Sequence, residues 1–174
     1  MNILDSINVL GLAEHPEHLE TILGWYLQEW PQVGSKQTLT RRLFGAGVSG
    51  KLPLALVAMS DLRPVGFISL VFHEKGMPTG RLHWVDALYT HPPFRRRGIA
   101  SFLLRIGEQR AMELGITDLY ALTDEVALYR QMGWTPVRET KPESLRDVVM
   151  HKQLRAWEPT DLAIQPRSSS DMNC

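Results

Sequence analysis

Residues 81–101, RLHWVDALYTHPPFRRRGIAS, carry the pattern that decides the fold of this 174-residue chain. Arg81–Thr90 is typical of a strand, and the prolines of HPPF end it because proline cannot continue a central ladder. From Gly98 to Leu114 the apolar spacing becomes helical, and Gly115 is placed to end that helix. A strand, a short loop and a helix N-terminus form a ready anion site, because the first N–H groups of a helix are unpaired and its dipole is positive there.

The neighbouring segments extend this unit into a mixed sheet. Upstream we expect a strand at Ser6–Leu12, a helix from Pro16 to Trp30, a shorter helix at Ser35–Phe44, and a hairpin of Pro53–Ser60 with Val65–His73. Downstream we expect a strand at Asp118–Thr123, a helix at Asp124–Met132, and strands at Trp134–Arg138 and Arg146–Leu154. Hairpins require antiparallel pairing, whereas a strand–helix–strand crossover requires parallel pairing. The predicted fold class is α/β of the α+β type, with a mostly antiparallel mixed sheet and one parallel crossover.

Composition narrows the class of protein. The length suits one domain, which we place at 1–155, and the Ser- and Pro-containing segment 156–174 is predicted to be a flexible tail. The 19 basic residues balance 19 acidic ones, which argues against a nucleic-acid or anionic-membrane binder. No apolar run is long enough to span a membrane, and a single cysteine, Cys174, excludes a disulfide framework. These features predict a cytoplasmic protein.

Two motifs in the sequence point to a known family. Arg95-x-x-Gly98-x-Ala100 stands between a strand and a helix, and it lacks both the Lys-Ser/Thr pair of a Walker loop and the third glycine of a dinucleotide loop. About 30 residues later comes a helix with Tyr129, followed by Gly133-Trp134. Together these features resemble the GNAT superfamily of N-acetyltransferases, whose acetyl-CoA motif is R/Q-x-x-G-x-G/A. The resemblance covers 6–154 by element order and 82–136 by motif.

The resemblance implies a GNAT-like fold, acetyl-CoA as co-substrate and a role for each matching residue. The backbone of the strand end would pair with the pantetheine arm, and the loop and first helical turn, which Arg95 opens, would hold the pyrophosphate. Tyr129 would be the general acid that protonates the departing thiolate. One departure is the absence of the asparagine that many members carry at the end of the fifth strand. The implied coenzyme-binding residues are Leu88, Tyr89, Thr90, Arg95, Arg96, Arg97, Gly98, Ile99, Ala100 and Ser101.

Acetyl transfer to an amine also requires a proton acceptor, since a lysine-like amine has a pKa near 10.4. Asp86 is the leading candidate: it stands in an otherwise apolar strand, and strict alternation puts it on one face with Leu88 and Thr90. A structural, hydrogen-bonded aspartate is the alternative reading of the same position. His83 is a second candidate base, on the opposite face. We expect direct attack of the amine on the thioester, because Cys174 has no partner base nearby in sequence.

The acceptor is less constrained by the sequence. Residues 1–34 contain five acidic residues and no Lys or Arg, which would suit a small cationic amine if these residues line the acceptor site; the alternative is a solvated helix face. A peptide or protein N-terminus is a second candidate acceptor, and a non-catalytic acyl-CoA-binding regulatory module is a third hypothesis. The pair His15-x-x-His18 has helical ligand spacing but no third ligand nearby, so no metal site is predicted. A homodimer is compatible with the sequence.

Overall fold

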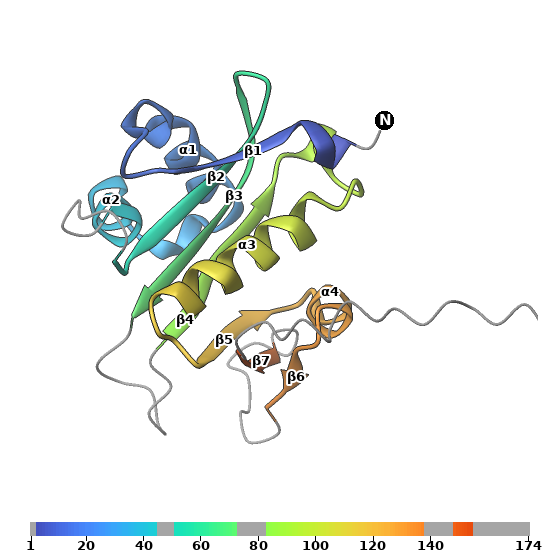
Figure 1. The fold of residues 1–174 in the computed structure, drawn as a ribbon. Coiled ribbons are helices and arrows are strands. Elements are labelled where there is room, and N and C mark those ends of the chain that lie inside the picture. The colour runs from blue at the N-terminus through green and yellow to red at the C-terminus, as the bar shows by residue number, and fades with distance from the viewer. Residues whose placement is uncertain (1–2, 45–50, 73–82, 138–147, 155–174) are drawn as a thin grey trace, which may run out of the picture.

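A seven-stranded sheet organises the molecule (Figure 1). The computed structural model describes residues 3–44, 51–72, 83–137 and 148–154. Along the sheet the strands run β1-β2-β3-β4-β5-β7-β6. Their bounds are β1 Ile7–Gly11, β2 Leu54–Ser60, β3 Arg63–Phe72, β4 His83–Thr90, β5 Asp118–Thr123, β6 Thr135–Pro136 and β7 Val148–Gln153. Within the described residues only β4 and β5 pair in parallel, and the other neighbouring strands are antiparallel, which confirms the predicted fold class.

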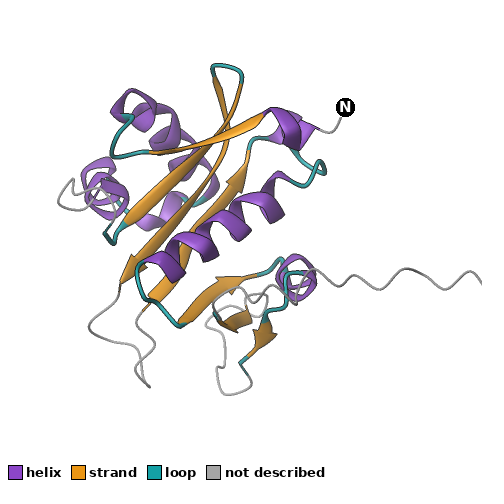
Figure 2. Ribbon diagram, in the orientation of Figure 1, coloured by secondary structure: helices purple, strands orange, loops and turns teal. Residues whose placement is uncertain are grey.

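Helices cover both faces of this sheet (Figure 2). Their bounds are α1 Leu19–Glu29, α2 Lys36–Phe44, α3 Ile99–Glu113 and α4 Val126–Gln131, with short 3-10 turns at Ile3–Ser6, Pro16–His18, Pro31–Val33 and Pro92–Phe94. Helices α1 and α2 lie on one face, called the α1–α2 face below, and α3 lies on the other, called the α3 face. In the part of the chain that the structure describes, no helix is both long and apolar enough to cross a membrane.

Each face has its own apolar core. On the α3 face, buried leucines of α3 such as Leu103 and Leu104 pack with Ile68 of β3 and with Tyr129 and Trp134. On the α1–α2 face the core joins Tyr26 and other residues of α1 and α2 to alternate residues of β2, β3 and β4. The period of two along the strands and the 3.6-residue period along the helices explain this division. Because helices pack on both faces of the sheet, the residues of β4 and α3 are held in fixed positions.

Several predicted boundaries were too generous. Ser6 belongs to the first 3-10 turn, where its hydroxyl donates to the Ile3 carbonyl at 2.8 Å, so β1 begins one residue later. The predicted strand at 134–138 is only Thr135–Pro136, because the Trp134 N–H donates to the Tyr129 carbonyl at 3.0 Å and completes the end of α4. The loop at 139–145 and the predicted tail at 156–174 with Cys174 lie outside the described residues.

Candidate active site

The parallel pair β4–β5 separates partway along its length. Pairing is limited to Trp84 with Tyr120 and Val85 with Ala121. Beyond Val85, the β4 residues 88–90 keep their antiparallel partners on β3 but have no strand partner on the β5 side among the described residues. Unpaired strand edges present free N–H and C=O groups. This part of β4 therefore has an edge where an extended ligand could pair, the role predicted for Leu88, Tyr89 and Thr90, although the Thr90 carbonyl already accepts a hydrogen bond from Arg95 Nε.

A helix N-terminus opens directly beyond this strand end. Two left-handed residues, Arg96 with φ 62° and Gly98 with φ 82°, turn the loop into α3. The first backbone hydrogen bond of the helix runs from the Phe102 N–H to the Gly98 carbonyl at 3.0 Å, so the N–H groups of residues 99–101 precede the ladder. Exposed N–H groups at the positive end of a helix dipole bind anions. The loop therefore has a backbone geometry that could hold an anion, the role that the sequence predicts for it.

The three arginines of this loop have different surroundings. Arg95 turns toward α1: its Nε donates to the Thr90 carbonyl at 2.9 Å, and its guanidinium lies 3.6 Å from the Glu29 carboxylate. Arg97 lies over the Phe94 ring, 5.9 Å from its centroid, and both Arg96 and Arg97 are exposed. Arg95 thus connects the loop to α1, while Arg96 and Arg97 leave positive charge at the surface beside the helix N-terminus.

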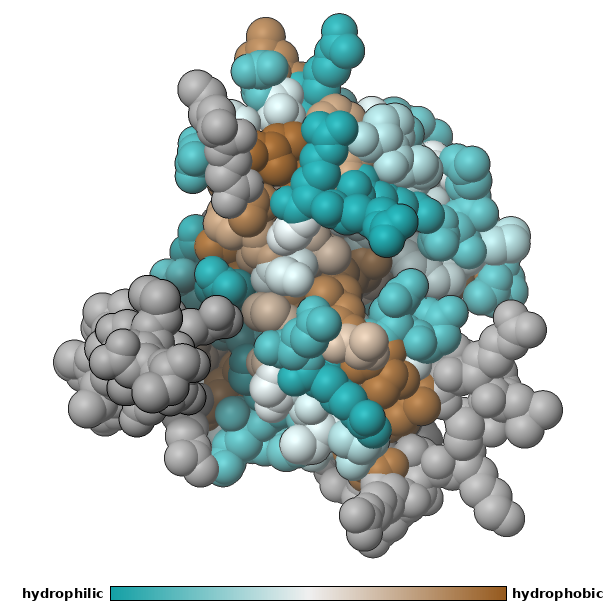
Figure 3. Space-filling view, turned by 90° about the vertical axis from the view of Figure 1, so that its right-hand side faces the viewer, coloured by the Kyte–Doolittle hydropathy of each residue, from teal (hydrophilic) through white to brown (hydrophobic). Residues whose placement is uncertain are grey.

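Two buried polar atoms mark the end of β4. Thr90 Oγ1 and His91 Nδ1 have no hydrogen-bond partner among the described residues. Buried polar groups are normally satisfied, so unpaired ones call for a partner that binds there. The loop and α4 lie on the right-hand side in Figure 1, and Figure 3 shows that side, where a strip of hydrophobic side chains runs between hydrophilic ones. A free strand edge, unpaired hydroxyl and anion-binding loop fit the amide arm and pyrophosphate of coenzyme A.

Tyr129 is a buried proton donor on α4. Its side chain is 4% exposed and packs edge-on against Trp134, with ring centroids 5.1 Å apart. Burial, and secondly the charge of Glu108, raise the pKa of the Tyr129 hydroxyl well above 10, so it stays protonated at neutral pH. Its oxygen is not one of the buried polar atoms that lack a hydrogen-bond partner, which among the described residues are Thr90 Oγ1 and His91 Nδ1. The hydroxyl is a candidate proton donor to a bound ligand.

A polar network that sequence reasoning missed holds α4 against α3. Glu108 of α3 accepts hydrogen bonds from the Trp134 indole N–H at 2.7 Å and from Lys152 Nζ of β7 at 2.6 Å. Lys152 also donates to the Met132 carbonyl at 2.7 Å, at the end of α4. The signal in the sequence was a carboxylate on the apolar stripe of α3, between Leu104 and Ala111. This network sets the position of Tyr129.

Asp86 lies at the opening but on the α1–α2 face. The β3–β4 register skips it, because Ser69 pairs with Ala87 while Leu70 pairs with Val85. In this β-bulge Asp86 and Ala87 turn to the same face, so alternation is broken. The expectation that Asp86 shares a face with Leu88 and Thr90 was therefore wrong: Leu88 packs into the α3-face core, and Asp86 does not.

Three side chains meet around the Asp86 carboxylate. Its Oδ1 forms an ion pair with the Arg42 guanidinium of α2. Its Oδ2 accepts a hydrogen bond from the Tyr26 hydroxyl of α1 at 2.8 Å, and Ser69 Oγ lies 3.5 Å away. Burial, and secondly the Asp86 charge, raise the pKa of Tyr26, which keeps this donor protonated. Asp86 is thus a buried, hydrogen-bonded carboxylate at the point where β4 leaves β5.

The remaining sequence candidates lie away from this opening. His83, at the start of β4, packs against Phe72 with ring centroids 5.4 Å apart, and burial lowers its pKa. His15 bonds Glu17 at 3.1 Å and lies 6.4 Å from the His18 ring. Over the described ranges, no three His, Cys, Asp or Glu side chains are grouped as a metal site would require.

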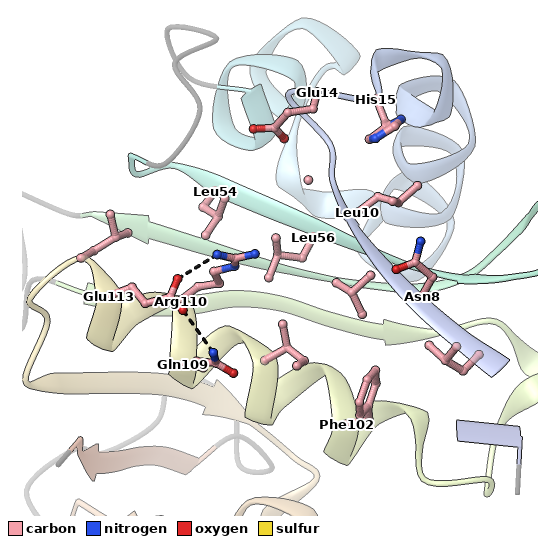
Figure 4. A pocket seen from close by; sticks show the side chains of 15 residues that line it. Asn8, Leu10, Glu14, His15, Leu54, Leu56, Phe102, Gln109, Arg110 and Glu113 are labelled. Carbon is pink, nitrogen blue, oxygen red and sulfur yellow. Dashed lines mark hydrogen bonds and ion pairs between the residues drawn. The ribbon is translucent and has the colours of Figure 1, made fainter. Parts of the chain in front are cut away.

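A separate pocket of about 600 Å³ lies between β1, β2 and α3 (Figure 4). Leu54, Leu56 and Phe102 form part of its apolar lining, and Glu113 on its border accepts hydrogen bonds from Arg110 at 2.8 Å and Gln109 at 3.1 Å. Neither Asp86 nor Tyr129 lines this pocket. It is therefore distinct from the opening beside β4.

Comparisons with known proteins agree with this geometry. A structure of a GNAT-family acetyltransferase from Streptococcus pneumoniae matches with TM-score 0.65 and 14% identity, covering 86% of this chain and 99% of that one. A structure of a NatC complex bound to Gag peptide and CoA matches with TM-score 0.67 and 16% identity, covering 86% of this chain and 99% of that one. A structure of an aminoglycoside 6'-acetyltransferase type Ii matches with TM-score 0.64 and 17% identity, covering 87% of this chain and 99% of that one. At these identities the likeness shows the fold.

The family assignment comes from the sequence itself. No curated protein matches this chain. The model of the acetyltransferase (GNAT) family matches residues 19–134, about two-thirds of the chain. That span contains the unpaired end of β4, the anion-binding loop, and α4 with Tyr129. The chain therefore belongs to the GNAT family, and it is an N-acetyltransferase that uses acetyl-CoA.

Proposed function

We propose that this enzyme transfers acetyl directly to the primary amine of a small molecule, with Asp86 and Tyr129 as the catalytic residues. One observation carries the proposal. Val85 is the last β4 residue paired with β5, and Asp86 follows it at the opening. Tyr129 belongs to the same apolar cluster as Val85. These positions support a role for Asp86, on the α1–α2 face, as proton acceptor and for Tyr129, in the core of the α3 face, as proton donor to a ligand that binds where β4 leaves β5.

Each group has a distinct task. Acetyl-CoA supplies the acetyl group as a thioester, whose carbonyl carbon a neutral amine attacks. Asp86 accepts the proton that the amine loses, directly or through water. Tyr129 donates its proton to the sulfur as the carbon–sulfur bond breaks. The backbone of residues 88–90 orients the pantetheine arm, and the loop from Arg95 to Ser101 holds the pyrophosphate by the N–H groups that precede α3.

A thiol-release assay tests the proposal. The protein is incubated with acetyl-CoA and a library of amines, peptides with free N-termini included, and free thiol is measured. Amine-dependent release well above the spontaneous background supports direct transfer. The acyl-enzyme alternative predicts thiol release in a burst without any amine, and this would contradict the mechanism. Preferential use of peptides would favour the second candidate acceptor, a peptide or protein N-terminus. One of the structures with a similar fold is a NatC complex bound to Gag peptide and CoA.

A further inference from the structure

Three acidic side chains of the α1–α2 face are paired with basic ones. Glu20 pairs with Lys36 of α2, and Glu29 lies 3.6 Å from Arg95, so these two residues do not form a free acidic wall. At the centre Arg42 forms an ion pair with Asp86. This pair offers a ligand one cation and one anion, which matches a ligand that itself carries one charge of each sign.

The Arg42–Asp86 ion pair also keeps an acceptor from reaching Asp86 while the pair is intact. Asp86 is 4% exposed and has both carboxylate oxygens engaged, Oδ1 by Arg42 and Oδ2 by Tyr26. With donors on both oxygens and little exposure, the Asp86 carboxylate is blocked from an incoming ammonium group. An acceptor can reach Asp86 Oδ1 only when Arg42 has another anion to bind. Arg42 has the freedom to move, because its side chain is 32% exposed and its guanidinium is carried on a long flexible stem.

We propose that the acceptor is an amino carboxylate, whose carboxylate draws Arg42 away from Asp86. This inference rests on the proposed function. The ammonium group of the acceptor then replaces the guanidinium at Asp86 Oδ1, and the single ion pair becomes two without a change in net charge. The proton moves from the acceptor nitrogen to Oδ1, and the neutral amine attacks the thioester. Tyr26 keeps its hydrogen bond to Oδ2 throughout.

This exchange makes Arg42 a specificity-determining residue. A simple cationic amine leaves the guanidinium without an anion and must compete with it for Asp86. A peptide has an amide where the amino acid has a carboxylate, so it meets the same competition. Only an acceptor with both charges releases the base that deprotonates it, so binding and activation are coupled in one side-chain movement.

The test compares matched acceptors in wild-type enzyme. Each amino acid in a panel of α-, β- and γ-amino carboxylates is paired with the decarboxylated amine of the same skeleton and with a dipeptide that begins with the same residue. Thiol release gives kcat/KM for every acceptor. We expect at least one amino carboxylate to exceed its decarboxylated partner and its dipeptide by about tenfold or more, the effect of one hydrogen bond between charged groups.

The variants separate recognition from structural support. In Arg42→Met the preference for the carboxylate should fall by about tenfold or more. A purely structural loss would lower both acceptors equally and leave their ratio intact, and the intrinsic reactivity of each amine cancels in the comparison. Arg41→Met is the matched control, because Arg41 is the exposed neighbour on α2. Arg42→Lys keeps the positive charge beside Asp86 but loses the guanidinium, so it should show a smaller preference for the carboxylate than the wild type. This variant provides the test if Arg42→Met does not fold.

The outcomes are distinguishable. Equal or better use of decarboxylated amines or dipeptides by the wild type overturns the inference, while the proposed transfer to an amine stands. An unchanged ratio in Arg42→Met, or an unchanged ratio in Arg42→Lys where the Met variant does not fold, also overturns it. Absence of thiol release with every acceptor, despite acetyl-CoA binding measured by calorimetry, overturns the proposed function and this inference with it.

Discussion

Replacing Tyr129 by phenylalanine should separate folding stability from catalysis. The side chain is 4% exposed, and its oxygen is not one of the buried polar atoms that lack a hydrogen-bond partner. Because no hydrogen bond to a described residue is lost with the hydroxyl, its removal should change the free energy of unfolding by less than about 0.5 kcal/mol. For a chain of this length that is a change in Tm of about 1–2 °C at most. The ring, which packs against Trp134, is retained.

Catalysis, in contrast to stability, should change strongly. Loss of a general acid costs about 100-fold or more in rate, and the loss should appear in kcat because proton donation acts in the transition state. Calorimetric titration should show little change in acetyl-CoA affinity. The assay pairs thiol-release kinetics with differential scanning calorimetry on the same preparations.

Tyr26→Phe is the matched control for stability. It removes the same atom from an equally buried ring, but this hydroxyl donates to Asp86 at 2.8 Å. A hydrogen bond to a charged group contributes about 1.5–3 kcal/mol, so Tyr26→Phe should lower Tm where Tyr129→Phe does not. Wild-type turnover in Tyr129→Phe would remove this residue from the mechanism. A clear fall in its Tm would show that the hydroxyl has a structural partner instead.

Three further predictions test the loop, the network and the pH response. Gly98→Ala should weaken coenzyme binding, measured by titration calorimetry, because φ of 82° strains any side chain there; wild-type affinity would contradict the placement of the anion site. Glu108→Gln should destabilise the fold by about 3 kcal/mol in urea unfolding, because it leaves Lys152 without its carboxylate; a loss below about 0.5 kcal/mol, the scatter of surface substitutions, would make the network unimportant. Tyr26 and Tyr129 have pKa values raised above 10.0, so the stability they contribute is present below pH 10.0 and is lost as the pH rises through their folded values. Urea midpoints measured from about pH 9 to about pH 11 should fall, and should fall less when both residues are phenylalanine; equal slopes would refute this origin.

Much of the site could be predicted because its signals are local. The β4–α3 loop is recognisable from prolines that end a strand, from Gly98 at a position with positive φ, and from the helical spacing that follows. These features depend on residues only a few positions apart. Tyr129 was selected from the resemblance to the GNAT family, whose motif places a tyrosine in a short helix before a glycine and an aromatic residue, here Gly133 and Trp134. The Asp86 side chain was assigned to the wrong face because a bulge is set by the pairing of two strands, which one strand's sequence does not encode.

By itself, the sequence determined the order of elements, the mixed sheet and the loop between β4 and α3, because periodicity and turn residues act over short spans of chain. Only the tertiary structure decided what surrounds the proposed catalytic residues. The partners of Asp86 come from α1 and α2, with Tyr26 separated from it by 60 positions. Glu108 likewise meets Lys152 across 44 positions. Such contacts form only when helices pack on a sheet. For Asp86, which looks like an isolated acidic residue in the sequence, they supply the ion pair with Arg42.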